Sequence, residues 1–442
     1  MSSSKTEPET NYQTLLQTHP DFIIDEKKGL CFGKVPLQSL TDHYGSPVWV
    51  INADILTSRF QKLSKAFLQN KMDISIHYAV KANDHLAILD LLAKEGAGVD
   101  IVSLGELKRA LKVNINPRKI CFSGVGKTEE ELKTAIQLEI GQINVESREE
   151  LHLISKIAMD TGKKAAICLR INPDVDARTH HKITTGLAEN KFGIAYEQAL
   201  QIYKEASQLD NIFPLGFDVH IGSQISSVEP YKKAFIKMAK LVKQARKEGL
   251  EVSVLDCGGG FGISYYDEKE SDPYALANLM QEIFSSLNIR ICIEPGRWLV
   301  GPAGILISKV VRRKNNGPDA SPFIILDAAM NDLLRPAMYD AWHGILPIQA
   351  EIYKRPLEKQ NIDGPICESS DIFARQRLLP QLRENDEIAI LDAGAYGHVM
   401  SSSYNARPQA LQLMIKDKRL FVIKPRQTFE SLWNNETIPN GN

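Results

Sequence analysis

Eight short apolar runs, each followed by a helix-like stretch, repeat between residues 74 and 294 and constrain the fold more than any other feature. Strands that alternate with helices are typical of a parallel sheet, and eight such units in roughly 225 residues match the size of a closed (β/α)8 barrel. An open doubly wound sheet is the alternative, because its buried strands look equally apolar. The expected strands span residues 74–80, 99–102, 119–123, 142–145, 165–171, 215–220, 252–256 and 289–294.

A second pattern begins after Pro302, where the helical alternation stops and short strand-like runs follow one another. This pattern predicts a C-terminal antiparallel β domain. Strand-like residues near the N-terminus are expected to pair with it, so the predicted domains are a barrel over 46–302 and a β domain over 1–45 and 303–442. The expected strands of the β domain span residues 22–24, 30–32, 304–311, 323–327, 348–353, 387–391, 411–415 and 420–423.

Length and composition indicate a two-domain protein that acts on a small molecule. A chain of 442 residues is longer than one hydrophobic core usually supports. Its 53 basic and 54 acidic residues nearly cancel, so no overall field attracts nucleic acid or an anionic membrane. The six cysteines form no C-x-x-C pair, which predicts neither disulfides nor a metal site. The start lacks a secretory pattern and no run is long enough to span a bilayer, so we expect a cytoplasmic protein.

The first expected barrel strand ends at Lys81, within the segment Tyr78-Ala79-Val80-Lys81-Ala82-Asn83. Catalytic residues of such barrels lie where strands end. A lysine that is desolvated there favours the neutral amine, which attacks a carbonyl. The alternative is a surface lysine that extends from the strand end into water.

The later strand ends carry a second set of polar groups. Gly258, Gly259 and Gly260 follow the seventh strand, where their consecutive N–H groups form a cradle for phosphate; a flexible turn is the alternative. His220 ends the sixth strand, and Glu294 precedes Arg297 after the eighth, where an ordinary ion pair is the alternative.

These parts together match one cofactor. Pyridoxal 5'-phosphate requires an amine for its aldehyde, an aromatic group for its ring face, an acid for its ring nitrogen and a cradle for its phosphate. Lys81, His220, Glu294 and the three glycines supply one part each. The sequence therefore predicts a pyridoxal-phosphate site at one end of the barrel.

Three further groups lie in the C-terminal half. Arg335 and Tyr339 are four residues apart and would hold a carboxylate if both face one pocket. Cys367 follows a Gly-Pro turn, and Tyr396 lies between glycines. The alternatives are an inert thiol for Cys367 and ordinary surface contacts for the others.

The order of nine segments resembles the fold-type III, alanine-racemase-like family of pyridoxal-phosphate-dependent decarboxylases, and within it the diaminopimelate decarboxylases. The resemblance extends from about residue 45 to 408. The substitutions Asp84, Leu104 and His398 depart from the usual motifs but touch no assigned group. The segments are YAVKAN (78–83), GVDIVSLGEL (98–107), ENKFGI (189–194), HIGSQ (220–224), CGGGFG (257–262), EPGR (294–297), MNDLLRPAMYDAWH (330–343), CESSD (367–371) and DAGAYGHVMSSSYNARP (392–408).

The resemblance implies a role for each site residue. Lys81 would bind the cofactor aldehyde covalently, and Cys367 would handle a proton with it, while Glu294 and His220 complete the catalytic set. An acid at Glu294 favours decarboxylation, because it keeps the ring nitrogen protonated and the ring electron-accepting. The implied cofactor-binding residues are Lys81, His220, Ser223, Gly258, Gly259, Gly260, Glu294, Pro295, Gly296, Arg297 and Tyr396, and the implied substrate-binding residues are Arg297, Arg335, Tyr339, Glu368 and Tyr396.

The implied reaction is the decarboxylation of meso-2,6-diaminopimelate to L-lysine and CO2, the last step of lysine biosynthesis. The resemblance also implies a homodimer with shared active sites. One alternative is an ornithine, arginine or carboxynorspermidine decarboxylase on the same scaffold. Another is a noncatalytic pyridoxal-phosphate carrier.

Overall fold

The protein is represented by a computed structural model, which describes residues 12–72, 74–176, 191–317 and 320–439. The chain divides into two compact units. The barrel unit comprises residues 57–263 and 269–299, and the β unit comprises residues 1–56, 264–268 and 300–442.

Eight parallel strands close the barrel, as the alternation of apolar runs and helices predicts. Neighbouring strands pair in the order β5-β6-β7-β8-β9-β11-β12-β13, and β13 pairs with β5, so an open sheet is excluded. A ninth short strand, β10 (Ile194–Ala195), pairs with β9. The strands are β5 (Ile74–Ala79), β6 (Gly98–Ile101), β7 (Ile120–Phe122), β8 (Gln142–Val145), β9 (Ala165–Asn172), β11 (Ile212–Asp218), β12 (Val254–Asp256) and β13 (Arg290–Ile293).

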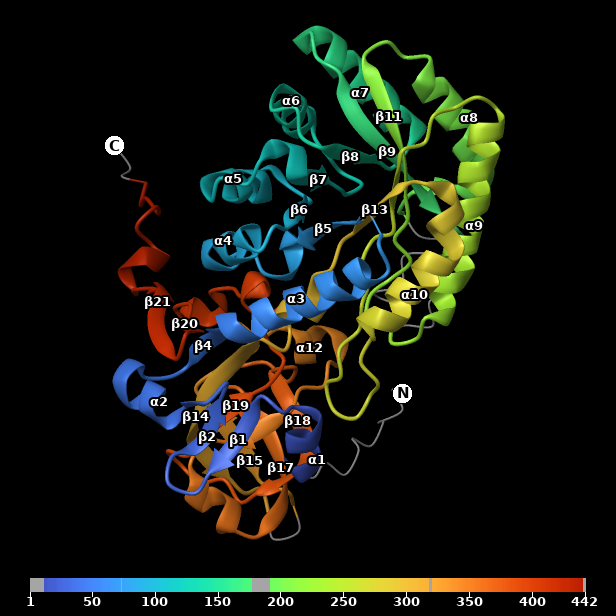
Figure 1. The fold of residues 1–442 in the computed structure, drawn as a ribbon. Helices are drawn as coiled ribbons and strands as arrows, with labels where there is room; N and C mark the ends of the chain where they lie inside the picture. Colours follow the sequence, from blue (N-terminus) through green and yellow to red (C-terminus); the bar gives the residue numbers. More distant parts are fainter. Residues whose placement is uncertain (1–11, 73, 177–190, 318–319, 440–442) are drawn as a thin grey trace. The chain divides into compact units, whose positions relative to one another are not determined.

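Helices surround these strands (Figure 1). Ser103, Thr128, Ser147 and Asp272 begin four of them, and each side chain accepts a hydrogen bond from a backbone N–H of the first turn. The apolar face of each helix packs on the strands. The helices are α3 (Ala53–Gln69), α4 (Leu86–Lys94), α5 (Leu104–Lys112), α6 (Glu129–Gln137), α7 (Arg148–Thr161), α8 (Tyr196–Ser207), α9 (Glu229–Lys247), α10 (Pro273–Phe284) and α11 (Arg297–Val300).

The β unit contains a nine-stranded sheet around a core that includes Trp49, Leu306 and Ile390. Most of its pairs are antiparallel, as predicted, whereas β15–β17 and β20–β4 are parallel. The strands are β4 (Val48–Asn52), β14 (Gly304–Lys314), β15 (Phe323–Leu326), β16 (Ile345–Pro347), β17 (Leu357–Asp363), β18 (Ile372–Pro380), β19 (Glu387–Ile390), β20 (Leu411–Lys416) and β21 (Arg419–Lys424), and the unit's helices include α1 (Tyr12–Thr18), α2 (Gln38–Tyr44) and α12 (Arg335–Tyr339).

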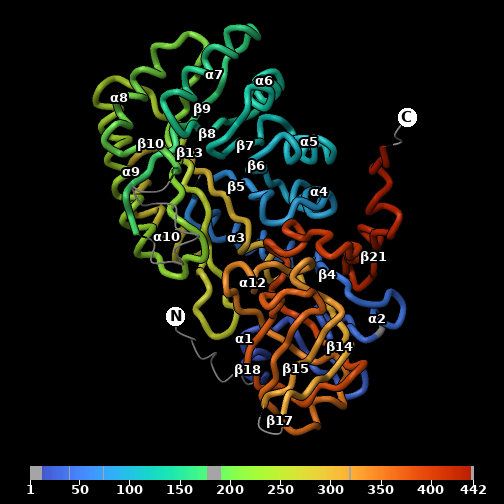
Figure 2. The backbone as a smooth tube through the Cα atoms, turned by 180° about the vertical axis from the view of Figure 1, so that it is seen from behind, coloured from blue at the N-terminus to red at the C-terminus, as the bar shows by residue number. Residues whose placement is uncertain are grey.

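The N-terminal segment belongs to the β unit but forms a sheet of its own. Strands β1 (Phe22–Asp25), β2 (Gly29–Phe32) and β3 (Val35–Pro36) pair with one another and not with the large sheet. In Figures 1 and 2 this blue segment lies beside the orange C-terminal strands. A backbone hydrogen bond of 2.7 Å joins Leu30 N to Ile348 O.

Further details differ from the sequence prediction. Residues 348–353 do not form a strand; the short 3-10 helix η5 (Ala350–Lys354) occupies most of this range. Strand β4 pairs with β14 and β20, which places residues 48–52 in the β unit although the predicted barrel range began at 46. None of the helices in the described ranges has both the length and the apolar character needed to cross a membrane.

Candidate active site

Lys81 lies at the carboxyl end of the barrel, in the short helix η1 (Val80–Ala82) that directly follows β5. Its Nζ is 2.7 Å from Oδ2 of Asp100, a fully buried carboxylate on β6. The Lys81 side chain keeps about a third of its exposure (35%), so the burial expected from sequence is only partial. The ion pair holds the amine at the barrel end.

Glu294 follows β13 at the same end and is buried. Oxygen atoms of Glu294, Asp218 and Asp256 lie within 4.8 Å of one another. Burial, followed by the nearby carboxylates Asp100, Asp256 and Asp218, raises the pKa of Glu294 well above its usual value. This environment therefore favours the protonated form of Glu294.

A hydrogen-bonded polar network connects these carboxyl groups. Oε1 of Glu294 is 3.4 Å from both Ser123 Oγ and Asn144 Nδ2. Gln142 Nε2 donates to Asn144 Oδ1 at 2.7 Å and to Asp256 Oδ2 at 3.0 Å. Burial raises the pKa of Asp256 to about 7, against the opposing hydrogen bonds from Gly258 and Gln142. The network fixes the position of Glu294 and lets buried carboxyl groups share protons.

The glycine turn approaches neighbouring backbone too closely for any side chain. A Cβ at Gly259 would lie 2.1 Å from the carbonyl oxygen of Glu294, and one at Gly260 would lie 2.2 Å from that of Gly222. Gly258 and Gly260 also have positive φ values of +64° and +92°. The turn therefore requires glycine, and within it Gly258 N donates to Asp256 Oδ1 at 3.1 Å.

His220 lies beside this turn and is half-buried. Its Nδ1 accepts a 3.2 Å hydrogen bond from Gly259 N, which leaves the proton of the neutral ring on Nε2. Burial, with Arg170 and Lys81 nearby, lowers the pKa of His220 well below its usual value. The ring is therefore neutral at physiological pH, as a group that stacks on an aromatic cofactor should be.

Arg297 completes the barrel end. It begins the short helix α11, is buried, and donates from Nη2 to Ser223 Oγ at 3.1 Å. At the preceding position, a Cβ on Gly296 would lie 3.0 Å from the Ala82 side chain and 3.2 Å from that of Ala79. A guanidinium and a hydroxyl thus lie together at the end of the barrel where the glycine turn also lies.

These residues fit pyridoxal phosphate. The glycine turn carries no side chain that would screen its backbone from a phosphate, and Arg297 supplies a cation for one. The barrel unit also supplies an amine at Lys81 and a buried acid with a raised pKa at Glu294. The structure brings together at one barrel end the barrel residues that the sequence assigns to the cofactor.

The remaining predicted residues lie in the β unit. Arg335 and Tyr339 are the first and last residues of α12 (Arg335–Tyr339). Arg335 is buried, its Nη1 is 2.8 Å from His343 Nε2, and its guanidinium lies 5.0 Å from the ring centre of Tyr265. His343 Nδ1 donates to Leu391 O at 2.8 Å, so Nε2 is the acceptor for Arg335. The guanidinium is thus held in place by two aromatic side chains.

Cys367 and Glu368 lie in the segment between β17 and β18, and both are exposed. Ser370 Oγ donates to Glu368 Oε1 at 2.6 Å, and this bond together with one from Tyr404 lowers the Glu368 pKa. Tyr396 follows β19 with a left-handed φ of +55°. In the ENKFGI motif, residues 189 and 190 lie outside the described residues.

Sequence reasoning missed several polar residues inside the barrel. Asp100 pairs with Lys81, and Ser123 and Asn144 contact Glu294. The charge of Arg170 acts on His220, and its Nη1 forms a 2.8 Å ion pair with Glu146. Each of them interrupts or closes an apolar strand segment. That interruption was the available sign of a polar residue in the barrel wall. Its side chain must point either into the packed interior or toward the surrounding helices.

Known proteins resemble this chain closely. Residues 54–301 match a family described as pyridoxal-dependent decarboxylase, pyridoxal binding domain. Among curated proteins, the diaminopimelate decarboxylase of Zymomonas mobilis is 41% identical, over 92% of this chain and 96% of its own. That of Vibrio cholerae is 42% identical, over 94% of this chain and 99% of its own.

Solved structures agree with these matches. Diaminopimelate decarboxylase from Helicobacter pylori, in complex with L-lysine, is 40% identical with a TM-score of 0.86 and covers 90% of this chain and 98% of its own. The enzyme from M. jannaschii, also in complex with L-lysine, is 34% identical with a TM-score of 0.89 and covers 96% of this chain and 99% of its own.

Proposed function

Because the chain belongs to the diaminopimelate decarboxylase family of pyridoxal-dependent decarboxylases, we propose that it converts meso-2,6-diaminopimelate to L-lysine and CO2. The predicted class of enzyme, a carboxy-lyase that uses pyridoxal phosphate, is confirmed. The assignment of the substrate rests on the similarity to these decarboxylases along more than nine-tenths of the chain. That similarity extends over both units.

Within the barrel unit, we assign the cofactor-binding roles from the contacts at the strand ends. Lys81 provides the amine that binds the cofactor aldehyde, and Asp100 holds this amine in place. The glycine turn and Ser223 with Arg297 bind the phosphate, next to Pro295 and Gly296. When bound, pyridoxal phosphate supplies the aldehyde and the electron-accepting ring that decarboxylation requires.

Glu294 and His220 set the electronic state of the site. Burial and three other acids raise the pKa of Glu294 and so favour its protonated form. Glu294 would share a proton with a ring nitrogen placed beside it. His220 is neutral and offers a flat ring face without adding charge. Both properties favour loss of CO2 over chemistry that needs an unprotonated ring.

Substrate recognition is assigned to the β unit together with Arg297. A guanidinium pairs bidentately with a carboxylate, and Arg335 is held for this by His343 and Tyr265. Diaminopimelate has a distal carboxylate and a distal ammonium. We assign the carboxylate to Arg297, Arg335 and Tyr339, and the ammonium to Glu368, whose lowered pKa keeps it charged.

Two further roles complete the proposal. Cys367 is exposed and acts with Lys81 in proton transfer after CO2 is lost, and Tyr396 lies by cofactor and substrate.

The segment 367–371 reaches a second copy of the chain, so the working form is a homodimer with shared active sites. We also propose the cytoplasm as its location, which six free thiols suit.

The decisive experiment is incubation with meso-diaminopimelate and pyridoxal phosphate, followed by identification of the amino acid formed. We expect L-lysine and an equal amount of CO2. Release of CO2 from ornithine but not from diaminopimelate would overturn the assignment of diaminopimelate as the substrate. A cofactor-loaded protein that releases no CO2 from either would be a carrier.

Variants separate the proposed roles in the same assay. Lys81→Ala should lose the visible cofactor band and all turnover, and borohydride should fix the pyridoxyl group on Lys81 of the parent protein. Cys367→Ala should keep the band and slow turnover. Parent-level turnover of Cys367→Ala would withdraw its role in proton transfer.

A further inference from the structure

A pocket of about 530 Å³ opens at the amino ends of the barrel strands, opposite the end that carries Lys81. Five strands contribute residues near their first positions, among them Ile74 of β5, Gly98 of β6, Ile120 of β7, Gln142 of β8 and Arg290 of β13. We call it the strand-start pocket. Its volume lies within the range of small-molecule sites, about 300–1,000 Å³.

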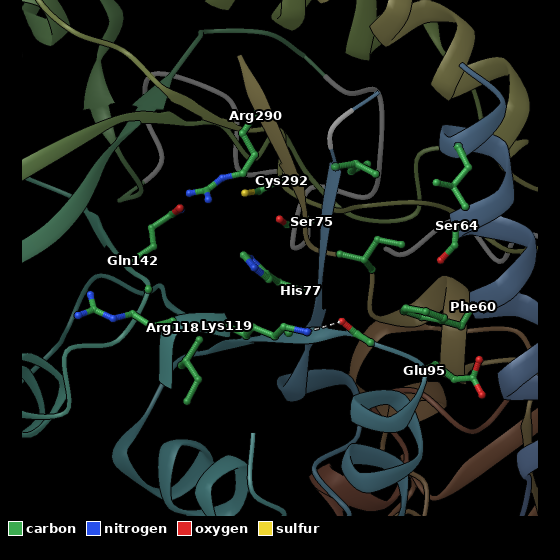
Figure 3. A pocket seen from close by; sticks show the side chains of 17 residues that line it. Phe60, Ser64, Ser75, His77, Glu95, Arg118, Lys119, Gln142, Arg290 and Cys292 are labelled. Carbon is green, nitrogen blue, oxygen red and sulfur yellow. Dashed lines mark hydrogen bonds between the residues drawn. The ribbon is translucent and has the colours of Figure 1, made fainter. Parts of the chain in front are cut away.

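Positive charge dominates the mouth of the strand-start pocket. Figure 3 shows Lys119 and Arg290 on two sides of His77. The structure gives Lys119 Nζ a 3.2 Å hydrogen bond to the carbonyl oxygen of Gly96. Within the described ranges, no ion pair neutralises Lys119 or Arg290. Two cations are thus held in one concave surface, where low-dielectric walls strengthen their field.

Other charges at the pocket are already engaged. Arg118 Nη2 forms a 3.2 Å ion pair with Glu139, and Glu95 Oε2 accepts a 3.0 Å hydrogen bond from Gln61. Glu95 is the acidic residue that lines the pocket. Its one negative charge, set against Lys119 and Arg290, leaves the pocket with an excess of positive charge.

His77 provides an independent sign of a missing ligand. Its side chain lines the pocket and is 9% exposed, and among the described residues its Nδ1 has no hydrogen-bond partner. A buried polar atom without a partner costs about 1–3 kcal/mol. Burial, followed by the opposing charge of Asp100 and the cations Arg290 and Lys119, lowers the pKa of His77 to about 4. The neutral ring therefore has one N–H to donate.

We propose that the strand-start pocket binds a small organic anion through Lys119 and Arg290, with His77 as an additional hydrogen-bond partner. Phe60, Leu68 and the isoleucines of the wall fit the carbon part of such a ligand. Packing of the barrel end does not require this arrangement, because the two exposed cations repel each other and the buried Nδ1 of His77 lacks a hydrogen-bond partner among the described residues. The anionic group of this ligand is a carboxylate or a phosphate. One experiment distinguishes the two.

The test is calorimetric titration of the cofactor-loaded protein, freed of excess cofactor, with inorganic phosphate in one arm and malonate in the other. Ionic strength is held constant with sodium chloride. We expect saturable binding of one anion per chain in at least one arm. If phosphate binds more tightly than malonate, the natural ligand is phosphorylated. If malonate binds more tightly, the ligand carries a carboxylate.

Matched variants locate the site. Lys119→Gln combined with Arg290→Gln should weaken binding about tenfold or more, since each charge-assisted hydrogen bond contributes more than a neutral one. Lys108→Gln combined with Lys133→Gln removes the same charge from exposed positions on α5 and α6 and should leave binding unchanged. Arg290→Lys keeps the charge and should retain most of the affinity.

Binding that is absent in both arms overturns the proposal, and so does a Lys119→Gln/Arg290→Gln variant that binds like the parent. The cofactor band reports whether this variant is folded. If it loses the band, the single variant Arg290→Gln replaces it and must weaken binding on its own. Neither residue contacts the cofactor end, so the outcome is independent of the proposed decarboxylation.

Discussion

At the residue scale, Gly259 is a position in the candidate site where no side chain fits. A Cβ there would lie 2.1 Å from the carbonyl oxygen of Glu294, which is backbone and has no room to move aside. Gly259→Ala must shift the glycine turn, to which we assign the phosphate. We expect a loss of about 1–3 kcal/mol in cofactor binding, measured by titrating the apoprotein with pyridoxal phosphate.

The control for this variant is Gly126→Ala. Gly126 precedes α6, and a Cβ at this position would have no neighbouring atom within 4 Å, so the added methyl group meets open space. The cofactor affinity of Gly126→Ala should equal that of the parent protein. If Gly259→Ala also binds the cofactor like the parent, the turn does not form the cradle.

Strand ends were a useful guide to which residues lie together, because parallel strands all finish at the same end of a barrel. Lys81, His220 and Glu294 were found in this way. Asp100 and Asn144 were not, although both are fully buried beside them. A polar residue inside an apolar strand gives no sign of which face it occupies until the register is known.

At the element scale, α6 begins with a reciprocal cap. Thr128 Oγ1 accepts from Glu131 N at 3.3 Å, and Glu131 Oε2 accepts from Thr128 N at 2.9 Å. Thr128→Ala should cost about 1 kcal/mol of local stability. Amide hydrogen exchange over residues 125–137 should become about fivefold faster, which mass spectrometry of that peptide measures.

Thr134→Ala is the matched control on the same helix. The Thr134 hydroxyl donates to Glu130 O within α6 and caps no terminus, and alanine is the better helix former. Exchange in this variant should stay at the parent rate or slow slightly. Equal acceleration in both variants would show that the cap contributes nothing specific.

The patterns of the two sheets explain which elements were predictable. Barrel strands are buried on both faces and read as apolar runs, so all eight were found. Strands β17 and β18 contain Lys359 and Arg377 among apolar residues, which obscured them. Residues 348–353 are apolar enough for a strand, but most of them form the 3-10 helix η5. Whether a segment becomes a strand depends on the neighbouring strands with which it pairs, and not on its composition alone.

At the scale of the whole molecule, the β unit is assembled from segments far apart in the sequence. His19 follows α1, and its Nε2 is 2.8 Å from Oδ2 of Asp392, which follows β19. Both side chains are buried, and His19 Nδ1 is 3.0 Å from Leu15 O. This ion pair joins residues that are 373 positions apart and ties the N-terminal segment to the C-terminal part.

The protonation of His19 makes this connection pH-dependent. Burial lowers the pKa of His19, but the charge and hydrogen bond of Asp392 and the Leu15 carbonyl oppose it, and the net pKa lies above the usual value of 6.5. A group whose pKa is raised by folding stabilises the folded state fully below its unfolded pKa. That contribution is lost as the pH rises through the folded-state pKa.

The pH dependence of stability therefore tests how the β unit is held together. The difference in melting temperature between the parent and His19→Gln should be largest near pH 5.5 and shrink as the pH rises toward 8.5. His43→Gln removes an exposed histidine of α2 in the same unit and should leave the profile unchanged. A difference that is constant or grows with pH would mean that His19 contributes through packing alone, since only its protonated form gains from the Asp392 charge.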